Sequence, residues 1–148
     1  MNSLNIELDY KWDNTSLPYV KGVWTPKLCS NVNGSHNYSK QIGKYLRIGD
    51  MVYIYASISL SLKDTSASGF TYVSGLPFKP NPANISIPLS FNYVNLKYPT
   101  GEFPVAYIHE TNPNIFLMKG INNSNMTNIY MTDIADNTSF MISGCYIV

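Results

Sequence analysis

Histidine is the side chain that most often acts as a general base near neutral pH, and this sequence of 148 residues contains two, His36 and His109. His36 lies in Gly34-Ser35-His36-Asn37, a composition typical of a turn. His109 is followed directly by Glu110, and neighbouring residues of a strand point to opposite faces of a sheet. The sequence therefore offers no ready catalytic dyad, and we expect no nucleophilic catalysis.

Hydrolysis of a glycosidic bond needs two carboxylates that stand on the order of 5–9 Å apart across the sugar. The acidic residues available for such a pair all lie in or beside predicted turns, where a carboxylate is usually solvated. They are Asp50, Asp64, Glu102, Glu110, Asp133 and Asp136. We therefore predict that the protein is not an enzyme.

Metal binding would need clustered His, Cys, Asp or Glu side chains. The segment Asp133-Ile134-Ala135-Asp136-Asn137 and the pair His109-Glu110 come nearest, but neither has the ligand count or spacing of an EF-hand or a zinc site. We predict no metal site and no cofactor. A cation held on an axis between subunits stays open as an alternative.

The composition favours non-covalent recognition of a carbohydrate over catalysis. Asn, Ser and Tyr are abundant, so the loops offer amides, hydroxyls and rigid aromatic surface at low charge. For any single residue of these loops, the alternative is an ordinary surface position without a ligand. The candidate binding residues lie in three polar loops: Lys97, Tyr98, Glu102, His109, Glu110, Asn112, Asn114, Asn122 and Asn123.

The charge balance argues against several classes of protein. The sequence has ten Lys and Arg residues and nine Asp and Glu residues, and Arg47 is its only arginine. A nucleic-acid-binding protein needs a basic surface. Apolar runs are only a few residues long, so no membrane insertion is predicted. Residues 1–13 mix charged with apolar side chains, unlike a signal peptide. Cys29 and Cys145 are too few for a disulfide framework, and we expect both to be reduced and buried, with a bridge between them as the alternative.

Apolar and polar residues alternate with a period of two, which is typical of β-strands. The clearest strand, Asp50–Leu62, is predicted to turn one apolar face toward the core: Val52, Ile54, Ala56, Ile58, Leu60 and Leu62. In the predicted strand Ile85–Val94, Pro88 lacks the backbone N–H that hydrogen bonding to a neighbouring strand needs. This predicts an edge position or a bulge. The further predicted strands are Val20–Leu28, Tyr38–Ile48, Phe70–Gly75, Ile85–Val94, Phe103–His109, Ile115–Lys119, Asn128–Thr132 and Ser139–Val148.

Eight or nine short strands separated by turn-rich breaks predict an all-β fold, an antiparallel β-sandwich of jelly-roll type. We assign residues 18–148 to this single domain and residues 1–17, where the alternation is weak, to a connector from an upstream segment.

Four segments carry motifs that belong together. Gly22–Leu28 reads G-V-W-T-P-K-L, Tyr38–Val52 contains Q-I-G-K-Y-L-R-I-G, Val73–Phe78 reads V-S-G-L-P-F, and Ile142–Ile147 reads I-S-G-C-Y-I. In order and spacing they resemble a domain found at the C-terminal ends of bacteriophage tail fibres and tailspikes, over about residues 20–148. We expect the motif residues to form a frame for folding rather than a binding site.

The side-chain chemistry of three motif residues suggests how such a frame is held. Trp24 brings a large apolar ring whose N–H needs a partner. Gln41 can satisfy two buried backbone groups at once. Arg47 is expected at an interface or as a clamp on a carboxylate.

The resemblance implies a homotrimer at the tip of a tail fibre or tailspike, made in the host cytoplasm and carried on the virion. There it would join an upstream fibre shaft and bind a host cell-surface glycan or protein. The uncharged face of Met51, Tyr53 and Tyr55, with Arg47, is the candidate trimer interface, and a second sheet covering that face is the alternative. Two rival functions stay open: a structural trimerisation cap, and a carbohydrate-binding module attached to a depolymerising tailspike.

Overall fold

Antiparallel strands make up nearly all of the regular structure in the computed structural model, which describes residues 19–32, 34–81, 86–97, 101–109, 112–121 and 124–148. The one helical element among them is a single 3-10 turn. The all-β prediction is thus confirmed. In chain order the elements are β1 (Tyr19–Trp24), β2 (Lys27–Val32), β3 (Asn37–Ile48), β4 (Met51–Leu62), β5 (Ser68–Ser74), β6 (Ile87–Leu96), β7 (Glu102–Ile108), β8 (Ile115–Ile121), β9 (Thr127–Asn128), η1 (Met131–Asp133) and β10 (Ile134–Ile147).

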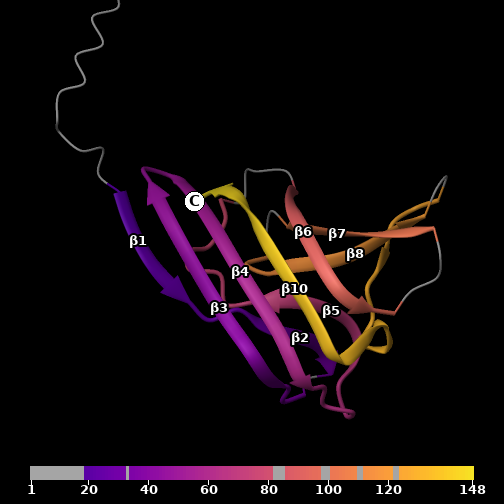
Figure 1. Cartoon of the computed structure of the whole chain (residues 1–148). Coiled ribbons are helices and arrows are strands. Elements are labelled where there is room, and N and C mark those ends of the chain that lie inside the picture. Colours follow the sequence, from indigo (N-terminus) through magenta and orange to yellow (C-terminus); the bar gives the residue numbers. More distant parts are fainter. Residues whose placement is uncertain (1–18, 33, 82–85, 98–100, 110–111, 122–123) are drawn as a thin grey trace, which may run out of the picture.

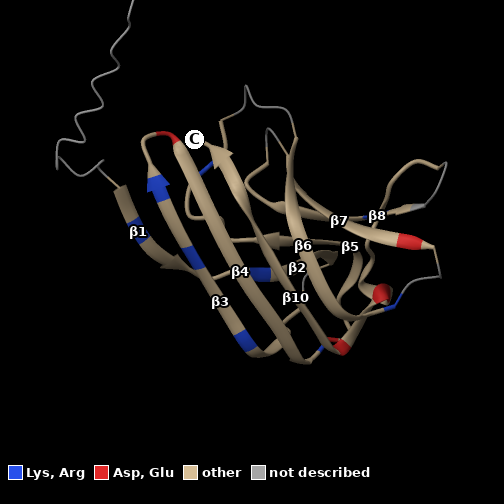
Figure 2. Cartoon of the chain, turned by 45° about the horizontal axis from the view of Figure 1, so that its top comes forward, with Lys and Arg blue, Asp and Glu red and all other residues tan. Residues whose placement is uncertain are grey.

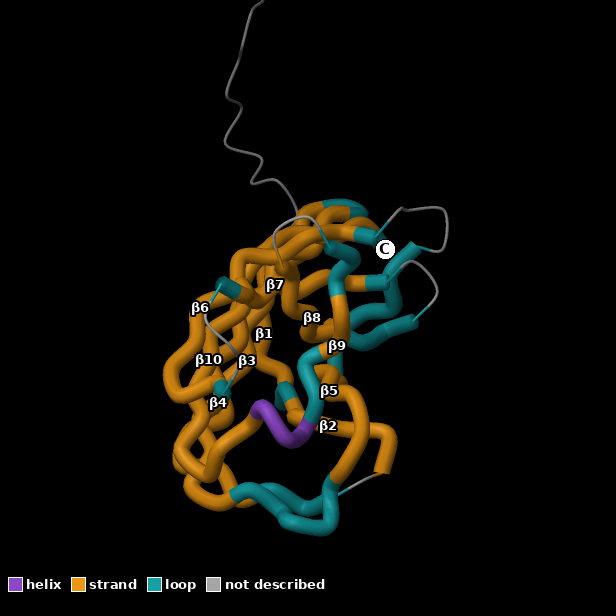
Figure 3. Tube along the Cα trace, turned by 90° about the vertical axis from the view of Figure 1, so that its right-hand side faces the viewer, coloured by secondary structure: helices purple, strands orange, loops and turns teal. Residues whose placement is uncertain are grey.

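The strands form one hydrogen-bonded sheet that curls into a half-barrel (Figure 1). Its order is β1-β3-β4-β10-β6-β7-β8-β5-β2, with β9 attached to β8. Strand β6 makes the bend, because its first residues pair with β7 and its later residues pair with β10. The curl brings β3, β4 and β10 opposite β2, β5 and β9, as the side view shows (Figure 3).

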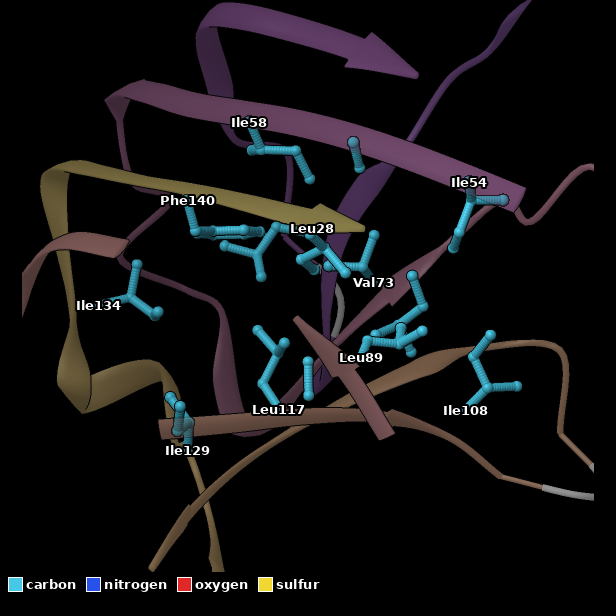
Figure 4. Packing of buried hydrophobic residues seen from close by; sticks show 14 of the residues in the cluster. Leu28, Ile54, Ile58, Val73, Leu89, Ile108, Leu117, Ile129, Ile134 and Phe140 are labelled. Carbon is cyan, nitrogen blue, oxygen red and sulfur yellow. The ribbon is translucent and has the colours of Figure 1, made fainter. Parts of the chain in front are cut away.

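The core lies inside this curl. Alternate residues of β4 from Val52 to Leu60 are buried, as predicted, and they meet side chains such as Phe140 and Leu117 from the other strands (Figure 4). Leu62 was predicted to join them but is 52% exposed. Leu62 is the last residue of β4 and pairs with Asn37, the first residue of β3, so it lies at the edge of the core.

Three strand boundaries differ from the prediction. The expected strand Val20–Leu28 is divided into β1 and β2 around Thr25 and Pro26, where the chain passes from one end of the sheet order to the other. The expected strand Asn128–Thr132 is a two-residue strand followed by η1, and β10 begins at Ile134 rather than Ser139. Pro88 lies in the part of β6 that pairs with β7 alone, so the prediction of an edge position is confirmed.

The motif residues interlock at the corner between β1 and β2. Trp24 is buried, and its Nε1 donates to the Lys44 carbonyl oxygen at 3.2 Å. Gln41 Nε2 donates to the Pro26 carbonyl oxygen at 2.9 Å. Gly75 has a φ of +94°, and a Cβ there would lie 2.5 Å from the Thr25 carbonyl oxygen, so no other residue fits without displacement.

Phe78 joins a second set of motif residues. The Tyr146 hydroxyl donates to the Phe78 carbonyl oxygen at 3.0 Å and accepts from the Phe78 N–H at 3.3 Å. The Tyr45 ring meets the Phe78 ring edge-on at 5.2 Å, and the Arg47 guanidinium lies over it at 4.9 Å. All four motif segments therefore contribute to one packed frame, as the sequence analysis expected.

Candidate functional site

Three aromatic side chains form a row across the outer face of β5, β8 and β7. Tyr72, Phe116 and Tyr107 are direct cross-strand partners, because Phe116 is paired with Tyr72 on one side and with Tyr107 on the other. The Phe116 ring is stacked on Tyr107 at 5.6 Å and lies 6.4 Å from Tyr72. We call Tyr72, Phe116 and Tyr107 the aromatic row.

The two-residue period of each strand keeps this row on the outside. Thr71 and Val73 of β5, Ile115 and Leu117 of β8, and Ala106 and Ile108 of β7 alternate with the row and are buried in the core. The rings themselves are half-buried. Burial raises the pKa of the Tyr72 hydroxyl, with a smaller contribution from Cys29, so this phenol stays a neutral hydrogen-bonding group.

Two further rings extend the aromatic row. Phe70 lies 6.3 Å from Tyr72 and 6.4 Å from Phe116, and the His109 ring meets Phe116 edge-on at 6.1 Å. Both are half-buried like the row. The result is a continuous aromatic surface over three strands.

A hollow of about 240 Å³ lies at the end of the row near Phe70, and we call it the asparagine hollow. Asn31 Oδ1 accepts from the Phe70 N–H at 3.1 Å, and the Asn112 N–H donates to the His109 carbonyl oxygen at 3.3 Å. These bonds hold the polar edge of the hollow against the rings. Its lining consists of Asn31, Phe70, Tyr72, Asn112, Asn114 and Phe116.

A larger hollow of about 550 Å³ lies at the other end of the row, and we call it the methionine hollow. Its lining is mostly apolar: Ser86, Pro88, Val105, Tyr107, His109, Met118 and Met126. None of the described residues that line either hollow carries a carboxylate, an ammonium or a guanidinium group.

The structure brings three of the predicted binding residues to this surface. His109 contacts the row, and Asn112 and Asn114 line the asparagine hollow. Lys97 lies elsewhere, at the end of β6, where its N–H donates to the Asp133 carbonyl oxygen at 2.7 Å. The remaining candidates Tyr98, Glu110, Asn122 and Asn123 lie outside the described residues.

Glu102 is a structural residue rather than a free binding group. Lys119 Nζ lies 3.3 Å from Glu102 Oε2 and 3.3 Å from Asp133 Oδ1, and all three side chains are largely buried. Burial alone would lower the pKa of Lys119, but the hydrogen bonds and charges of Glu102 and Asp133 outweigh it and raise the pKa. The ammonium therefore neutralises both carboxylates, and they do not face each other across an open site.

His36 is likewise held inside a turn. It is 8% exposed, and its Nδ1 accepts from the Asp64 N–H at 3.1 Å. Burial lowers the pKa of His36 below its usual 6.5. The Ser66 hydroxyl and the N–H groups of Ser35 and Ser66 lower the pKa of Asp64 to about 2. The two residues anchor the segment after β4.

The aromatic row itself was not predicted from the sequence. Phe70 and Tyr72 alternate with Thr71 and Val73, and Phe116 alternates with Ile115 and Leu117, so the local signal for an outward aromatic face was present. The pairing that places Tyr72 and Tyr107 on either side of Phe116 joins three separate strands, so it cannot be predicted from any one of them.

The candidate interface residues lie on the opposite outer face, formed by β1, β3, β4 and β10. Met51 is 45% exposed, Tyr53 is 44% exposed and Tyr55 is half-buried. Arg47 is not part of that face, because it pairs with the buried Val52, and it donates through Nε to the Gly49 carbonyl oxygen at 2.7 Å. Its nearest carboxylate oxygen, on the exposed Asp50, is 3.9 Å away.

More apolar side chains share this outer face with Met51, Tyr53 and Tyr55, and among the described strands no second sheet covers it. Three exposed lysines also lie on it, Lys21 of β1 and Lys40 and Lys44 of β3, whereas the acidic residues of the described chain lie at strand ends and in turns (Figure 2). We call this surface the open face. Its other large exposed hydrophobic side chains are Tyr19, Val23, Ile42, Val94, Met141 and Ile147.

The cysteines differ from the prediction. Both thiols are free, and Cys29 is half-buried with its Sγ 3.2 Å from Ser74 Oγ. Cys145 was expected to be buried but is exposed, because it pairs with Tyr53 and so lies on the open face.

Within the described ranges, no three His, Cys, Asp or Glu side chains come together as metal ligands. Nor does that part of the chain contain a helix of the length and apolar character that crossing a membrane requires.

Comparison with solved structures shows that this fold is similar to part of a tailspike protein. The crystal structure of the Dettilon tailspike protein (gp208) matches with a TM-score of 0.70 and 19% sequence identity. The match covers 87% of this chain and 24% of that chain, so this chain spans about a quarter of the length of that protein. No family model and no curated protein matches the sequence. The likeness is one of fold.

Proposed function

We propose that this chain is a tail-associated module of a virion that binds a host cell-surface receptor, a glycan, without catalysis. The observation that carries the proposal is the aromatic row with asparagine side chains at one end of it. The tailspike fold supports the viral context, and so does the resemblance of the four motifs to the C-terminal domains of tail fibres and tailspikes.

The chemistry of the row suits a sugar. The faces of aromatic rings pack against the C–H groups of a pyranose, and amides donate to and accept from its hydroxyls. Rigid aromatic side chains lose little conformational entropy when they bind. The hollows are shallow, so a single site is expected to bind weakly, and several copies on one particle would raise the avidity.

We further propose that three chains assemble through the open face at the tip of a longer fibre or spike. In this proposal each chain is a jelly-roll-like sandwich. The support is the group of exposed apolar side chains on the open face, which includes Met51, Tyr53 and Val23. The side chain of Val23 is 79% exposed. Exposed apolar surface of this kind is usually covered by a partner. A homotrimer would present three aromatic rows together.

Adsorption to cells tests the receptor proposal. The fluorescently labelled oligomer is incubated with bacterial strains to which a virion carrying this chain adsorbs, before and after periodate oxidation of the surface glycans. We expect binding that periodate abolishes. An oligomer that binds none of those strains would contradict the proposal and favour the structural trimerisation cap. Binding that survives periodate would point to a protein receptor.

The absence of catalysis is tested with the same strains. Surface polysaccharide is incubated with the protein, and reducing ends are measured over a day. We expect no release above the buffer control. A steady release would show an enzyme, whereas release only by a longer protein that includes this chain would identify a carbohydrate-binding module on a depolymerising tailspike.

A further inference from the structure

We propose that the aromatic row binds an uncharged, N-acetylated saccharide chain that lies across the strands, with the acetamido group in the methionine hollow and hydroxyl groups in the asparagine hollow. This inference rests on the proposed glycan-binding function. It adds the direction of the chain, its charge class and the position of one substituent.

The direction follows from the register. Tyr72, Phe116 and Tyr107 are paired residues on three adjacent strands, so the row runs perpendicular to the strands. Neighbouring strands are about 4.8 Å apart, so the row extends over about 10 Å. That length suits two or more consecutive sugar rings rather than a single monosaccharide. Because the rings are half-buried, neighbouring side chains hold them in place, so the binding surface is preorganised.

The charge class follows from the lining of the two hollows. An acidic sugar needs a cation or several hydrogen-bond donors to replace the water that its carboxylate loses, and an unpaired charge is costly to desolvate. The described lining residues contain no lysine or arginine, and the polar groups of the asparagine hollow are three amides and the Tyr72 hydroxyl. An amide donates and accepts equally well, which matches neutral hydroxyl groups.

The position of the acetamido group follows from the contrast between the hollows. Val105, Met118 and Met126 make the methionine hollow mainly apolar, and Ser86, Tyr107 and His109 add polar groups at its edge. A methyl group attached to a small polar amide fits this mixture, since the thioether side chains adapt to its shape. The asparagine hollow offers three amides beside Phe70 and suits hydroxyl groups instead.

The probe for the test is the purified surface polysaccharide of a strain that the wild-type oligomer binds. It is used in three forms: native, carboxyl-reduced and de-N-acetylated. We expect the native and carboxyl-reduced forms to bind equally and de-N-acetylation to weaken binding by at least tenfold, with re-N-acetylation restoring it. Loss of binding on carboxyl reduction, or no effect of de-N-acetylation, would overturn the inference.

Variants tie the effect to the aromatic row. Phe116→Leu keeps an apolar side chain for packing but removes the ring, and we expect at least a tenfold loss of affinity. Met118→Gln should reduce the preference for the native over the de-N-acetylated form. The matched control is Phe103→Leu, because Phe103 is an exposed ring on the same strand and face as Tyr107 but about 13 Å along the strand.

The outcomes separate the two proposals. If the wild-type protein binds no cells, this result contradicts both the proposed glycan-binding function and this inference. Cell binding that is equal in wild type and Phe116→Leu removes only the inference, since the receptor site then lies elsewhere. Melting temperatures of all variants are measured first, and Tyr107→Leu replaces Phe116→Leu if the latter does not fold.

Discussion

At the scale of single residues, Tyr146 shows how one hydroxyl joins distant motifs. Its side chain is buried, and the hydroxyl bonds to both the N–H and the carbonyl oxygen of Phe78. Removal of this group leaves two backbone groups without that partner. We expect Tyr146→Phe to lower the free energy of unfolding by about 1–3 kcal/mol in urea denaturation. Tyr130→Phe, at an exposed tyrosine outside the open face, is the control and should change it little.

The same hydroxyl makes stability depend on alkaline pH. Burial raises the pKa of Tyr146 to about 12, above the value of 10.0 in an unfolded chain. The unfolded state therefore loses this proton first, so the stabilisation is complete below pH 10 and is lost as the pH rises towards 12. Denaturation midpoints between pH 9 and 12 should fall more steeply in wild type than in Tyr146→Phe; parallel curves would contradict the argument.

His36 makes the corresponding prediction on the acidic side. Burial lowers its pKa below 6.5, so the unfolded chain takes up a proton before the folded one does. Stability should therefore fall as the pH decreases below 6.5. Urea denaturation at pH 7, 6 and 5 measures this slope. His36→Gln should flatten this slope; a flat profile in wild type would show that His36 does not titrate as proposed.

At the scale of the elements, the ion cluster of Glu102, Lys119 and Asp133 connects β7, β8 and η1 at one end of the core. We expect Lys119→Met to destabilise the fold by about 3 kcal/mol, because two largely buried carboxylates then lose their shared cation. The measurement is urea denaturation at pH 7. The triple variant Glu102→Gln, Lys119→Met, Asp133→Asn should recover most of the loss, and a triple variant as unstable as the single one would contradict this account.

The strands themselves were predictable to different degrees. In β4 the alternation from Val52 to Leu60 is strong, so its core face could be read from the sequence. The end of that face could not, since the exposure of Leu62 depends on where the pairing of β3 with β4 ends. Likewise, the division between β1 and β2 depends on the two ends of the curled sheet lying close together, which no local pattern encodes.

At the scale of the whole molecule, the open face decides the assembly. If three chains meet there, a charge placed among its apolar side chains should separate them, since a buried unpaired carboxylate is costly. We expect light scattering to give a trimer for wild type and a monomer for Tyr53→Glu. Phe103→Glu, on the other outer face, is the control and should stay trimeric. A monomeric wild-type chain would contradict the assembly.

The strand content, the core face of β4 and the motif residues of the frame could all be predicted from single segments, because they depend on residue types and a period of two within each segment. The binding candidates His109, Asn112 and Asn114 were chosen for their polar character, and the structure places them beside the aromatic row; their role in binding stays a prediction.

The folded chain was needed to show that Tyr72, Phe116 and Tyr107 form one surface and that Glu102 faces Lys119 rather than solvent. These arrangements depend on the register between strands that are far apart in the chain. Register results from the packing of all core side chains at once, so it is a property of the folded molecule and not of any of its segments.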